Sequence, residues 1–285
     1  MYNLFGDDMF SVEYKNGNAY VLCPDGLDLP HTLDCGQAFR WEENGNGIWR
    51  GAACGKYLEL EKAADGTVIF YNTSPADFNG VWRKYFDLDR DYGKINEIFS
   101  ENETLKKAAE YSYGIRILNQ NPWETLCSFI ISQNNNIKRI KGIISRLCES
   151  FGENKNGWYD FPSAEKIAAL TLDDLSVLRS GFRAKYILDA AQKVSGGEID
   201  LEGLKKLSTD EAREQLMKIK GVGPKVADCA ILFSLCHIDA FPKDVWIKRA
   251  MTVLFGGELP ENAKPYAGIA QQYIFFYARE TKLEV

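Results

Sequence analysis

The 285-residue sequence lacks the features of a membrane, secreted or metal-cluster protein. It has no run of about 18 uncharged apolar residues, which argues against a membrane-spanning helix. Its first residues, MYNLFGDDMF, carry acids and no basic leader, so no secretory signal is predicted. The seven cysteines are scattered and odd in number, which argues against a disulfide framework and against the clustered ligands of zinc or an iron–sulfur centre. We expect an intracellular, cytoplasmic protein without an iron–sulfur cluster.

Positive charge is also scarce overall, since the net charge is −6 and the isoelectric point is about 5.2. This acidity argues against a partner that is recognised through total charge, such as nucleic acid. Three short segments nevertheless carry cations and no acidic residue: 134–146, 179–186 and 217–226. They predict a basic face on an acidic body, because the local field matters more at a contact than the total charge. The alternative is that these cations lie on ordinary solvated helix faces.

Two kinds of pattern divide the chain, whose length suggests two subdomains. Residues 10–85 contain short alternating segments and turn residues, which are typical of a sheet with one solvated face. Strands are predicted at 18–22, 38–42, 48–52, 57–61 and 68–71. Helical spacing begins at residue 75, and later helices are predicted at 122–133, 137–151, 163–169, 172–180, 183–195, 209–219, 224–236, 244–254 and 262–280.

The most informative segment is residues 216–249, where a glycine hairpin separates two stretches of helical spacing. Gly221 and Gly223 allow positive φ and close backbone approach, so the hairpin can direct free N–H groups at a phosphate. Pro224 suits the first turn of the second helix, where its missing N–H costs nothing. The pattern predicts a helix–hairpin–helix at about 209–236.

Two residues near this hairpin are candidates for chemistry. Lys225 follows in the first helical turn, where the dipole disfavours a cation and favours the neutral amine that a nucleophile needs. The alternative is a solvated surface lysine. Asp244 either caps a helix or supplies a carboxylate that stabilises positive charge developing on a sugar. Both interpretations remain open from the sequence.

Two nucleotide-binding motifs are excluded here. GVGPK lacks the spacing and the Ser or Thr of a phosphate-binding loop. The dinucleotide fingerprint starts at Gly221 and Gly223 but fails at Val226, and the hairpin follows a helix rather than a strand.

The hairpin, Lys225 and the later Pro242-Lys243-Asp244 resemble the helix-hairpin-helix DNA glycosylase superfamily, and within it the 8-oxoguanine DNA glycosylases. Three further stretches carry the resemblance in family order: 36–41 (GQAFRW), 128–136 (SFIISQNNN), and Ala270-Gln271 with Phe275. The resemblance runs from about residue 30 to the C-terminus. It implies an α+β fold with an N-terminal antiparallel-sheet domain (1–118) and a mostly helical domain (119–285). The active site is expected in the cleft between them.

The resemblance implies a pocket for the damaged base. The Gly36 carbonyl would accept the N7–H of 8-oxoguanine, a donor that guanine lacks, and Gln271 would bind the Watson–Crick edge. Phe275 and Cys229 would lie on opposite faces of the base, and Pro242 belongs to the same pocket. The residues alone also allow a turn at Gly36, a solvated glutamine, and core positions for Phe275 and Cys229.

The resemblance also implies contacts with the opposite strand. Asn134 would fill the space that the damaged base leaves, while Arg139 and Arg183 would bind the orphaned partner base. Without the resemblance, Asn134 is a helix C-cap in the left-handed conformation and Arg183 forms a surface ion pair. The chain departs from the family at Phe182, where tyrosine is usual, and at Trp246, where a histidine near phosphate is common. The Phe182 ring can still wedge against a base, without the role of a hydroxyl, and Trp246 stays in the predicted set of DNA contacts.

The activity that the resemblance implies is bifunctional: excision of 8-oxoguanine from duplex DNA, followed by strand cleavage at the abasic site. Lys225 would attack C1′ and form a Schiff base, Asp244 would stabilise the charged sugar, and β-elimination would nick the strand. The partner is damaged double-stranded DNA, no cofactor is required, and the protein is expected to be a monomer. One alternative is a helix-hairpin-helix glycosylase for an oxidised pyrimidine or mispaired adenine. Another is a non-catalytic DNA-binding helix-hairpin-helix module.

A cation site is also implied at the hairpin. Backbone carbonyls of Met217, Ile219 and Val222 would hold a monovalent or divalent cation, and this ion would help Gly221 and Gly223 to bind a DNA phosphate.

Overall fold

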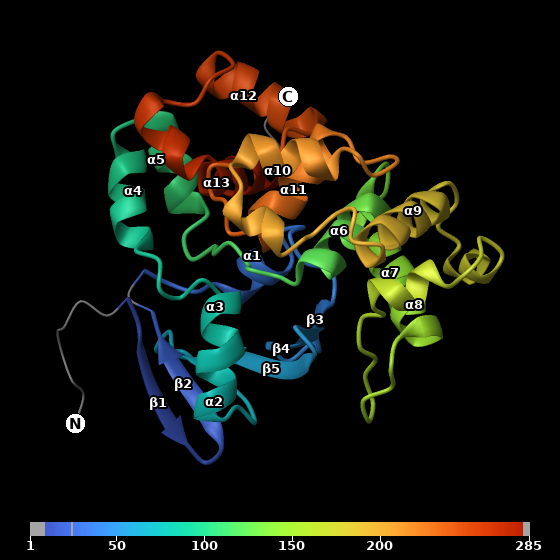
Figure 1. The fold of residues 1–285 in the computed structure, drawn as a ribbon. Helices are drawn as coiled ribbons and strands as arrows, with labels where there is room; N and C mark the ends of the chain where they lie inside the picture. Colours follow the sequence, from blue (N-terminus) through green and yellow to red (C-terminus); the bar gives the residue numbers. More distant parts are fainter. Residues whose placement is uncertain (1–8, 24, 282–285) are drawn as a thin grey trace.

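The computed structural model describes residues 9–23 and 25–281, and its N-terminal part is a six-stranded antiparallel sheet (Figure 1). The strand order is β1-β2-β6-β5-β4-β3. In the β4–β5 ladder, Ile48 pairs with Glu61 and Ala53 with Lys56. The strands are β1 (Ser11–Lys15), β2 (Asn18–Leu22), β3 (Trp41–Glu43), β4 (Ile48–Ala53), β5 (Lys56–Lys62) and β6 (Val68–Phe70).

One helical segment packs its aromatic side chains on this sheet. It consists of α2 (Pro75–Asp77), a π-helical turn (Phe78–Trp82) and α3 (Arg83–Tyr85). The Phe70 ring of β6 meets Phe78 and Phe86 edge-on, each at a centroid distance of 5.4 Å. Trp41 donates its indole N–H to the Tyr85 hydroxyl at 2.8 Å, which satisfies both polar groups inside the core. The sheet therefore has a buried aromatic face.

The rest of the chain is mostly helical and lies above the sheet in Figure 1. Its longest helices are α7 and α13, and α6 packs against α11 with Phe129 and Phe233 stacked at 5.4 Å. The helices are α1 (Leu29–Leu33), α4 (Tyr92–Ser100), α5 (Glu103–Tyr111), α6 (Pro122–Ser132), α7 (Ile137–Phe151), α8 (Ala164–Ala168), α9 (Arg183–Ser195), α10 (Thr209–Leu216), α11 (Pro224–Ser234), α12 (Val245–Phe255) and α13 (Ala267–Glu280). Three 3-10 helices span Asp174–Leu178, Gly203–Lys206 and Glu261–Tyr266.

Local sequence signals fix where these helices begin. Asn121 and Asn136 cap α6 and α7 by accepting backbone N–H groups of the first turn, and Pro122 starts α6. Ser208 and Glu211 form a reciprocal capping box at the start of α10. These caps satisfy donors that the helix itself leaves unpaired.

The hydrophobic core has two parts. One contains buried residues from Ala19 to Leu88 together with Leu118, and the other contains Cys35, Phe39 and residues from Tyr92 to Ala278. Helices α4 and α5 thus share the core of the C-terminal helices, although they precede the predicted domain boundary at 118/119. That boundary stays a prediction.

A buried glutamine connects the two parts. The Gln37 amide donates to the carbonyls of Thr32 at 2.9 Å and Arg116 at 2.8 Å, and its oxygen accepts the Leu118 N–H at 3.0 Å. Gln120 in turn donates to the Gln37 carbonyl at 2.7 Å. The segment around Gly36 is therefore anchored to the interior.

The predicted α+β class with a helical C-terminal part is confirmed, and several elements differ in detail. The segment predicted as a helix at 172–180 is a 3-10 helix over Asp174–Leu178. The strand predicted at 38–42 begins at Trp41, because residues before it form the anchored loop around Gly36. The helix predicted at 262–280 is a 3-10 helix followed by α13, with Pro265 inside the 3-10 part. Within 9–23 and 25–281 no helix is both long and apolar enough to cross a membrane.

Candidate active site

The hairpin between α10 and α11 has the geometry that the sequence predicts. Gly221 has φ +79°, and a Cβ there would lie 2.4 Å from the Tyr186 ring, so only glycine fits. Gly223 caps α11 without a side-chain hydrogen bond, and Pro224 stands in the first turn. The first N–H groups of α11 consequently have no side-chain cap, which suits a phosphate at this helix start.

Lys225 is half-buried on α11, and its Nζ lies 5.2 Å from the centroid of the Phe129 ring. Cys229 follows on the same helix face and is buried. Burial raises the pKa of the Cys229 thiol to about 11, while the charge of Lys225 and a hydrogen bond from it oppose this rise. The charges of Asp228 and, to a lesser degree, Asp244 also raise the pKa of this thiol.

Asp244 is the N-cap of α12. Its carboxylate accepts the Ile247 N–H at 2.7 Å. The structure therefore confirms that Asp244 is a helix cap. A carboxylate has a second oxygen, which can accept from another partner. The preceding Pro242 is buried, so the turn that presents Asp244 is fixed by packing.

Two segments predicted to bind the lesion are linked by buried hydrogen bonds between Cys35, Gln272 and Gln271. The Cys35 thiol donates to the Gln272 oxygen at 3.4 Å, and the Gln272 amide donates to the Gln271 oxygen at 2.7 Å. Gly36, next to Cys35, has φ +95° and open space around its α-carbon. Gln271 is buried rather than solvated, and Phe275 is partly buried against the core. These hydrogen bonds connect the loop that contains Gly36 with the α13 segment that contains Gln271.

The alternative that Arg183 forms a surface ion pair is wrong, because its side chain is buried and binds backbone carbonyls. The side chain is buried, and its guanidinium donates to the carbonyls of Gln133 at 2.8 Å, Asn134 at 3.0 Å and Ser180 at 3.1 Å. Burial and, to a lesser degree, the charge of Arg139 lower the pKa of Arg183. Asn134 itself is exposed in the left-handed conformation, with φ 48°. Arg183 therefore holds the loop that presents Asn134.

Three other predicted DNA contacts are solvent-exposed. Arg139 is exposed on α7, Phe182 is 45% exposed and Trp246 is 55% exposed. The Arg183 guanidinium lies over the Phe182 ring at 4.4 Å. Within the predicted basic face, the charge of Lys141 is paired with Asp34, and the Arg146 guanidinium donates to the Leu178 carbonyl.

The predicted cation site is a turn of backbone carbonyls. The Ile219 carbonyl accepts the Val222 N–H at 3.0 Å, and the neighbouring Lys218 carbonyl accepts the Lys193 ammonium. Met217 is 43% exposed. Among residues 9–23 and 25–281, no group of three or more His, Cys, Asp or Glu side chains could hold a metal ion.

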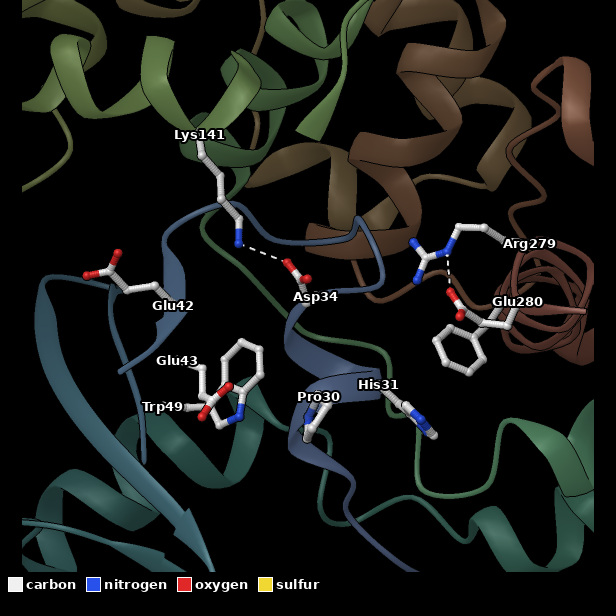
Figure 2. Close-up of a pocket in the computed structure, with 10 residues that line it drawn as sticks. Pro30, His31, Asp34, Glu42, Glu43, Trp49, Lys141, Arg279 and Glu280 are labelled. Atoms are coloured by element: carbon white, nitrogen blue, oxygen red, sulfur yellow. Dashed lines mark hydrogen bonds and ion pairs between the residues drawn. The ribbon is translucent and has the colours of Figure 1, made fainter. Parts of the chain in front are cut away.

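Two surface pockets have linings without Lys225 and Asp244. The first, of about 430 Å³, has Trp49 and Phe276 in its lining, and Figure 2 shows Lys141 paired with Asp34 and Arg279 with Glu280 around it. The second, of about 400 Å³, lies beside Glu124.

Phe39 and Phe129 lie in two of the motifs that resemble the family, but no role in the site was predicted for their rings. The hydrogen bond between Cys35 and Gln272 was not predicted either. No local pattern could have indicated it, because the two residues are 237 positions apart in the sequence.

An antiparallel sheet joined to a helical part with a hairpin, a lysine and an aspartate defines a helix-hairpin-helix DNA glycosylase. Residues 20–126 match the model for "8-oxoguanine DNA glycosylase, N-terminal domain", and residues 127–266 match "HhH-GPD superfamily base excision DNA repair protein". The chain belongs to the 8-oxoguanine DNA glycosylase family within this superfamily.

Relatives with solved structures match over almost the whole chain. A structure of MBOgg1 with a low-affinity DNA ligand is 42% identical, with a TM-score of 0.89 over 96% of this chain and 99% of the other. A Clostridium acetobutylicum 8-oxoguanine glycosylase/lyase, bound to DNA with cytosine opposite 8-oxoG, is 39% identical, with a TM-score of 0.89 over 97% of this chain and 100% of the other. The N-glycosylase/DNA lyase of Saccharomyces cerevisiae is 40% identical over 58% of this chain, and the match spans 48% of the yeast enzyme's length.

Proposed function

We propose that this protein is a bifunctional DNA glycosylase and abasic-site lyase that excises 8-oxoguanine from duplex DNA in base excision repair. The observation that carries the proposal is the position of Lys225. It lies half-buried in the first turn of α11, directly after the glycine hairpin, against the buried Phe129 ring and one turn before the buried Cys229. A lysine in this setting can act as a nucleophile on a sugar that the hairpin holds through its phosphate.

The proposed reaction has two stages. The damaged nucleotide is flipped out of the duplex, the Lys225 amine bonds to C1′, and the bond from C1′ to the base breaks. Asp244 stabilises the positive charge on the sugar while this occurs. Ring opening gives a Schiff base, and loss of a proton from C2′ expels the 3′ phosphate, which nicks the strand. Hydrolysis of the Schiff base then releases Lys225.

Lesion choice is proposed to depend on the pocket around Gly36. Its carbonyl would accept the N7–H of 8-oxoguanine, and Gln271 would bind the pairing edge. Phe275 and Cys229 would contact the two faces of the base, with Pro242 beside them. The anchoring of Gln37 supports this role, because a fixed carbonyl discriminates better than a mobile one.

On the opposite strand, Asn134 is proposed to enter the vacated space and Arg139 to bind the orphaned cytosine. Arg183 would hold the loop and would reach the base only after exchanging its carbonyl contacts. Phe182 and Trp246, both exposed, are proposed to contact the bent duplex through their rings.

The hairpin is proposed to bind the DNA backbone with the help of a cation. Gly221 and Gly223 would bind a phosphate, assisted by a cation on the carbonyls of Met217, Ile219 and Val222, since carbonyl oxygens suit hard cations. No other cofactor is required. We propose a monomer that acts inside the cell on damaged double-stranded DNA.

Borohydride trapping tests the proposal. The wild-type protein should form a covalent adduct with a duplex that carries one 8-oxoguanine opposite cytosine, and none with the undamaged duplex. Lys225→Gln should bind the damaged duplex and form no adduct. Lys220→Gln is the matched control, since this hairpin lysine is exposed and only its backbone N–H is bound, to Asp189 at 2.7 Å. Adducts with thymine glycol or mispaired adenine, but not 8-oxoguanine, would favour the glycosylase for another lesion. Equal binding to all duplexes with no adduct would favour the non-catalytic module.

A further inference from the structure

The amine proposed as nucleophile lies against an aromatic ring. Lys225 Nζ is 5.2 Å from the centroid of Phe129, and a phenylalanine face attracts an ammonium group within about 6 Å. Phe129 is only 3% exposed, so water does not screen the inner side of the contact. The ring therefore restricts where the end of the lysine side chain can lie.

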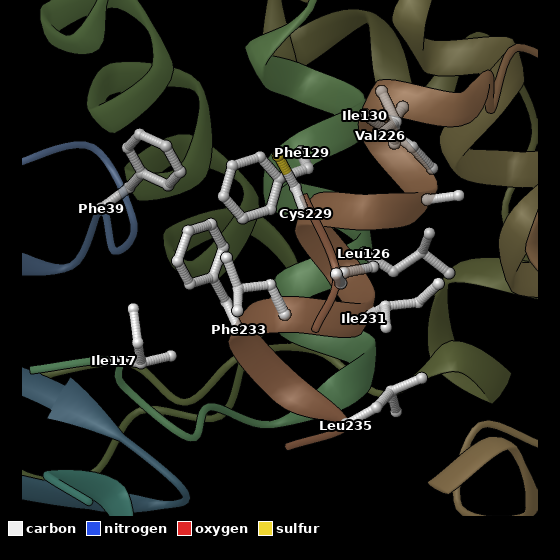
Figure 3. Close-up of a cluster of buried hydrophobic side chains, with 14 of the residues drawn as sticks. Phe39, Ile117, Leu126, Phe129, Ile130, Val226, Cys229, Ile231, Phe233 and Leu235 are labelled. Carbon is white, nitrogen blue, oxygen red and sulfur yellow. The ribbon is translucent and has the colours of Figure 1, made fainter. Parts of the chain in front are cut away.

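The Phe129 ring is itself held by two others. Phe39 meets it edge-on, with centroids 5.7 Å apart, and Phe233 stacks on it at 5.4 Å with an interplanar angle of 18°. Figure 3 shows the three rings close together, with Phe39 coming from the loop before β3, Phe129 from α6 and Phe233 from α11. All three are buried, so Phe129 has little freedom to move independently of its neighbours.

Phe39 belongs to the same loop as Gly36. Between them, Gln37 is fully buried and fixed by hydrogen bonds to Thr32, Arg116 and Leu118. Gly36 and Phe39 are consequently held in a fixed relation to each other, on either side of this anchored residue. From Phe39 the path continues through one ring contact to Phe129, and from there to Lys225.

We infer that Phe129 is a positioning residue for Lys225, and that Phe39 sets the place of its ring from the lesion-binding loop. This inference deepens the proposed function and rests on it. The anchored loop that presents the Gly36 carbonyl then also fixes, through two ring contacts, where the amine lies.

Fluorinated phenylalanines at position 129 test the first part. One to three ring fluorines weaken the negative ring face and change the shape of the side chain little. We expect single-turnover adduct formation with the 8-oxoguanine duplex to slow stepwise with fluorine number, by about two- to fivefold for the trifluorinated ring. The variants are compared at the pH where each reacts fastest, so that a change in the neutral fraction of the amine does not enter the comparison. The same substitutions at Phe99, a buried ring that meets Tyr273 at 5.9 Å, are the matched control and should show no trend. A constant rate across the series at Phe129 would overturn the inference.

A double-mutant cycle tests the second part. Phe39→Leu and Phe129→Leu should each slow excision, and the double variant should be about as slow as Phe129→Leu alone, because coupled residues are not additive. If the rate effects of the two single variants multiply in the double variant, the two rings act independently, and this would refute the coupling of Phe39 to Phe129. Thermal unfolding checks that each leucine variant is folded, and the fluorine series supplies a test if one is not. If the wild-type protein forms no adduct at all, the proposed function fails, whereas a wild-type adduct with a flat fluorine series defeats only this inference.

Discussion

Asp244 can be changed so that its charge is lost and its helix cap is kept. Its carboxylate accepts the Ile247 N–H at 2.7 Å at the start of α12. Asparagine is about as good an N-cap as aspartate, so Asp244→Asn should retain this hydrogen bond. The substitution therefore separates the two interpretations that the sequence left open.

The expected magnitudes differ for stability and for rate. Loss of a negative charge at a helix N-terminus costs about 0.3–1 kcal/mol. In a chain of this size, that lowers the Tm by only about 1–4 °C. Loss of electrostatic stabilisation of a developing charge costs ~10²–10³ in rate. We expect Asp244→Asn to be nearly as stable as wild type and to excise 8-oxoguanine at least a hundredfold more slowly.

Single-turnover excision and thermal unfolding are measured on Asp244→Asn and Asp244→Ala together. The alanine variant also loses the cap, which costs a further ~0.5–2 kcal/mol. It should therefore unfold at a lower temperature than the asparagine variant while reacting at a similar rate. An asparagine variant with near wild-type excision would refute the catalytic role and leave Asp244 as a cap only.

Three further outcomes are expected. Arg139→Ala should relax the preference for cytosine opposite the lesion by about ten- to a hundredfold, and the control Lys138→Ala should not. The measurement is single-turnover excision of 8-oxoguanine opposite cytosine and opposite adenine. Equal cleavage opposite both bases in wild type would contradict the role of Arg139. Gly221→Ala should cost about 1 kcal/mol or more, because φ is +79° and the new Cβ would meet Tyr186 at 2.4 Å. Gly221→Ala should also weaken binding to DNA. In wild type, the affinity for DNA measured by anisotropy should fall steeply over a roughly tenfold range of salt, and an affinity that does not change with salt would exclude phosphate contacts. Burial raises the pKa of Cys229 to about 11 from an ordinary 9.0, so the stability that the protonated thiol contributes is complete below pH 9 and is lost as pH rises toward 11. The free energies of unfolding of wild type and Cys229→Ala should therefore converge between pH 9 and 11. A constant difference would contradict the burial of this thiol.

Most elements with a strong local pattern could be predicted from the sequence. Residues 57–61 alternate clearly and lie in β5, the strand predicted at 48–52 lies in β4, and 137–151 and 183–195 coincide with α7 and α9. The strand β1 (Ser11–Lys15) was not predicted, because it is an edge strand with little burial and so has a weak pattern. The short helix α1 was missed for a related reason, since Leu29–Leu33 is too brief to show helical spacing.

The candidate site was predictable as a set of residues but not as a geometry. The motif predicts that Lys225 starts a helix and that Asp244 caps one, because both signals are local. The environment of Arg183 was not predictable: its guanidinium binds carbonyls of a loop about fifty positions earlier in the chain. The ring contact between Phe129 and Lys225 likewise depends on how α6 packs against α11, which no local pattern encodes.

The identity of the residue that bonds to the DNA tests the account most directly. After borohydride treatment of the wild-type protein with the 8-oxoguanine duplex, the adduct is digested with protease and nuclease and the modified peptide is sequenced by mass spectrometry. The account predicts one modified residue, Lys225, in the peptide that contains Val226 and Cys229. Modification at another lysine, or at the N-terminal amine with Lys225 unmodified, would contradict it.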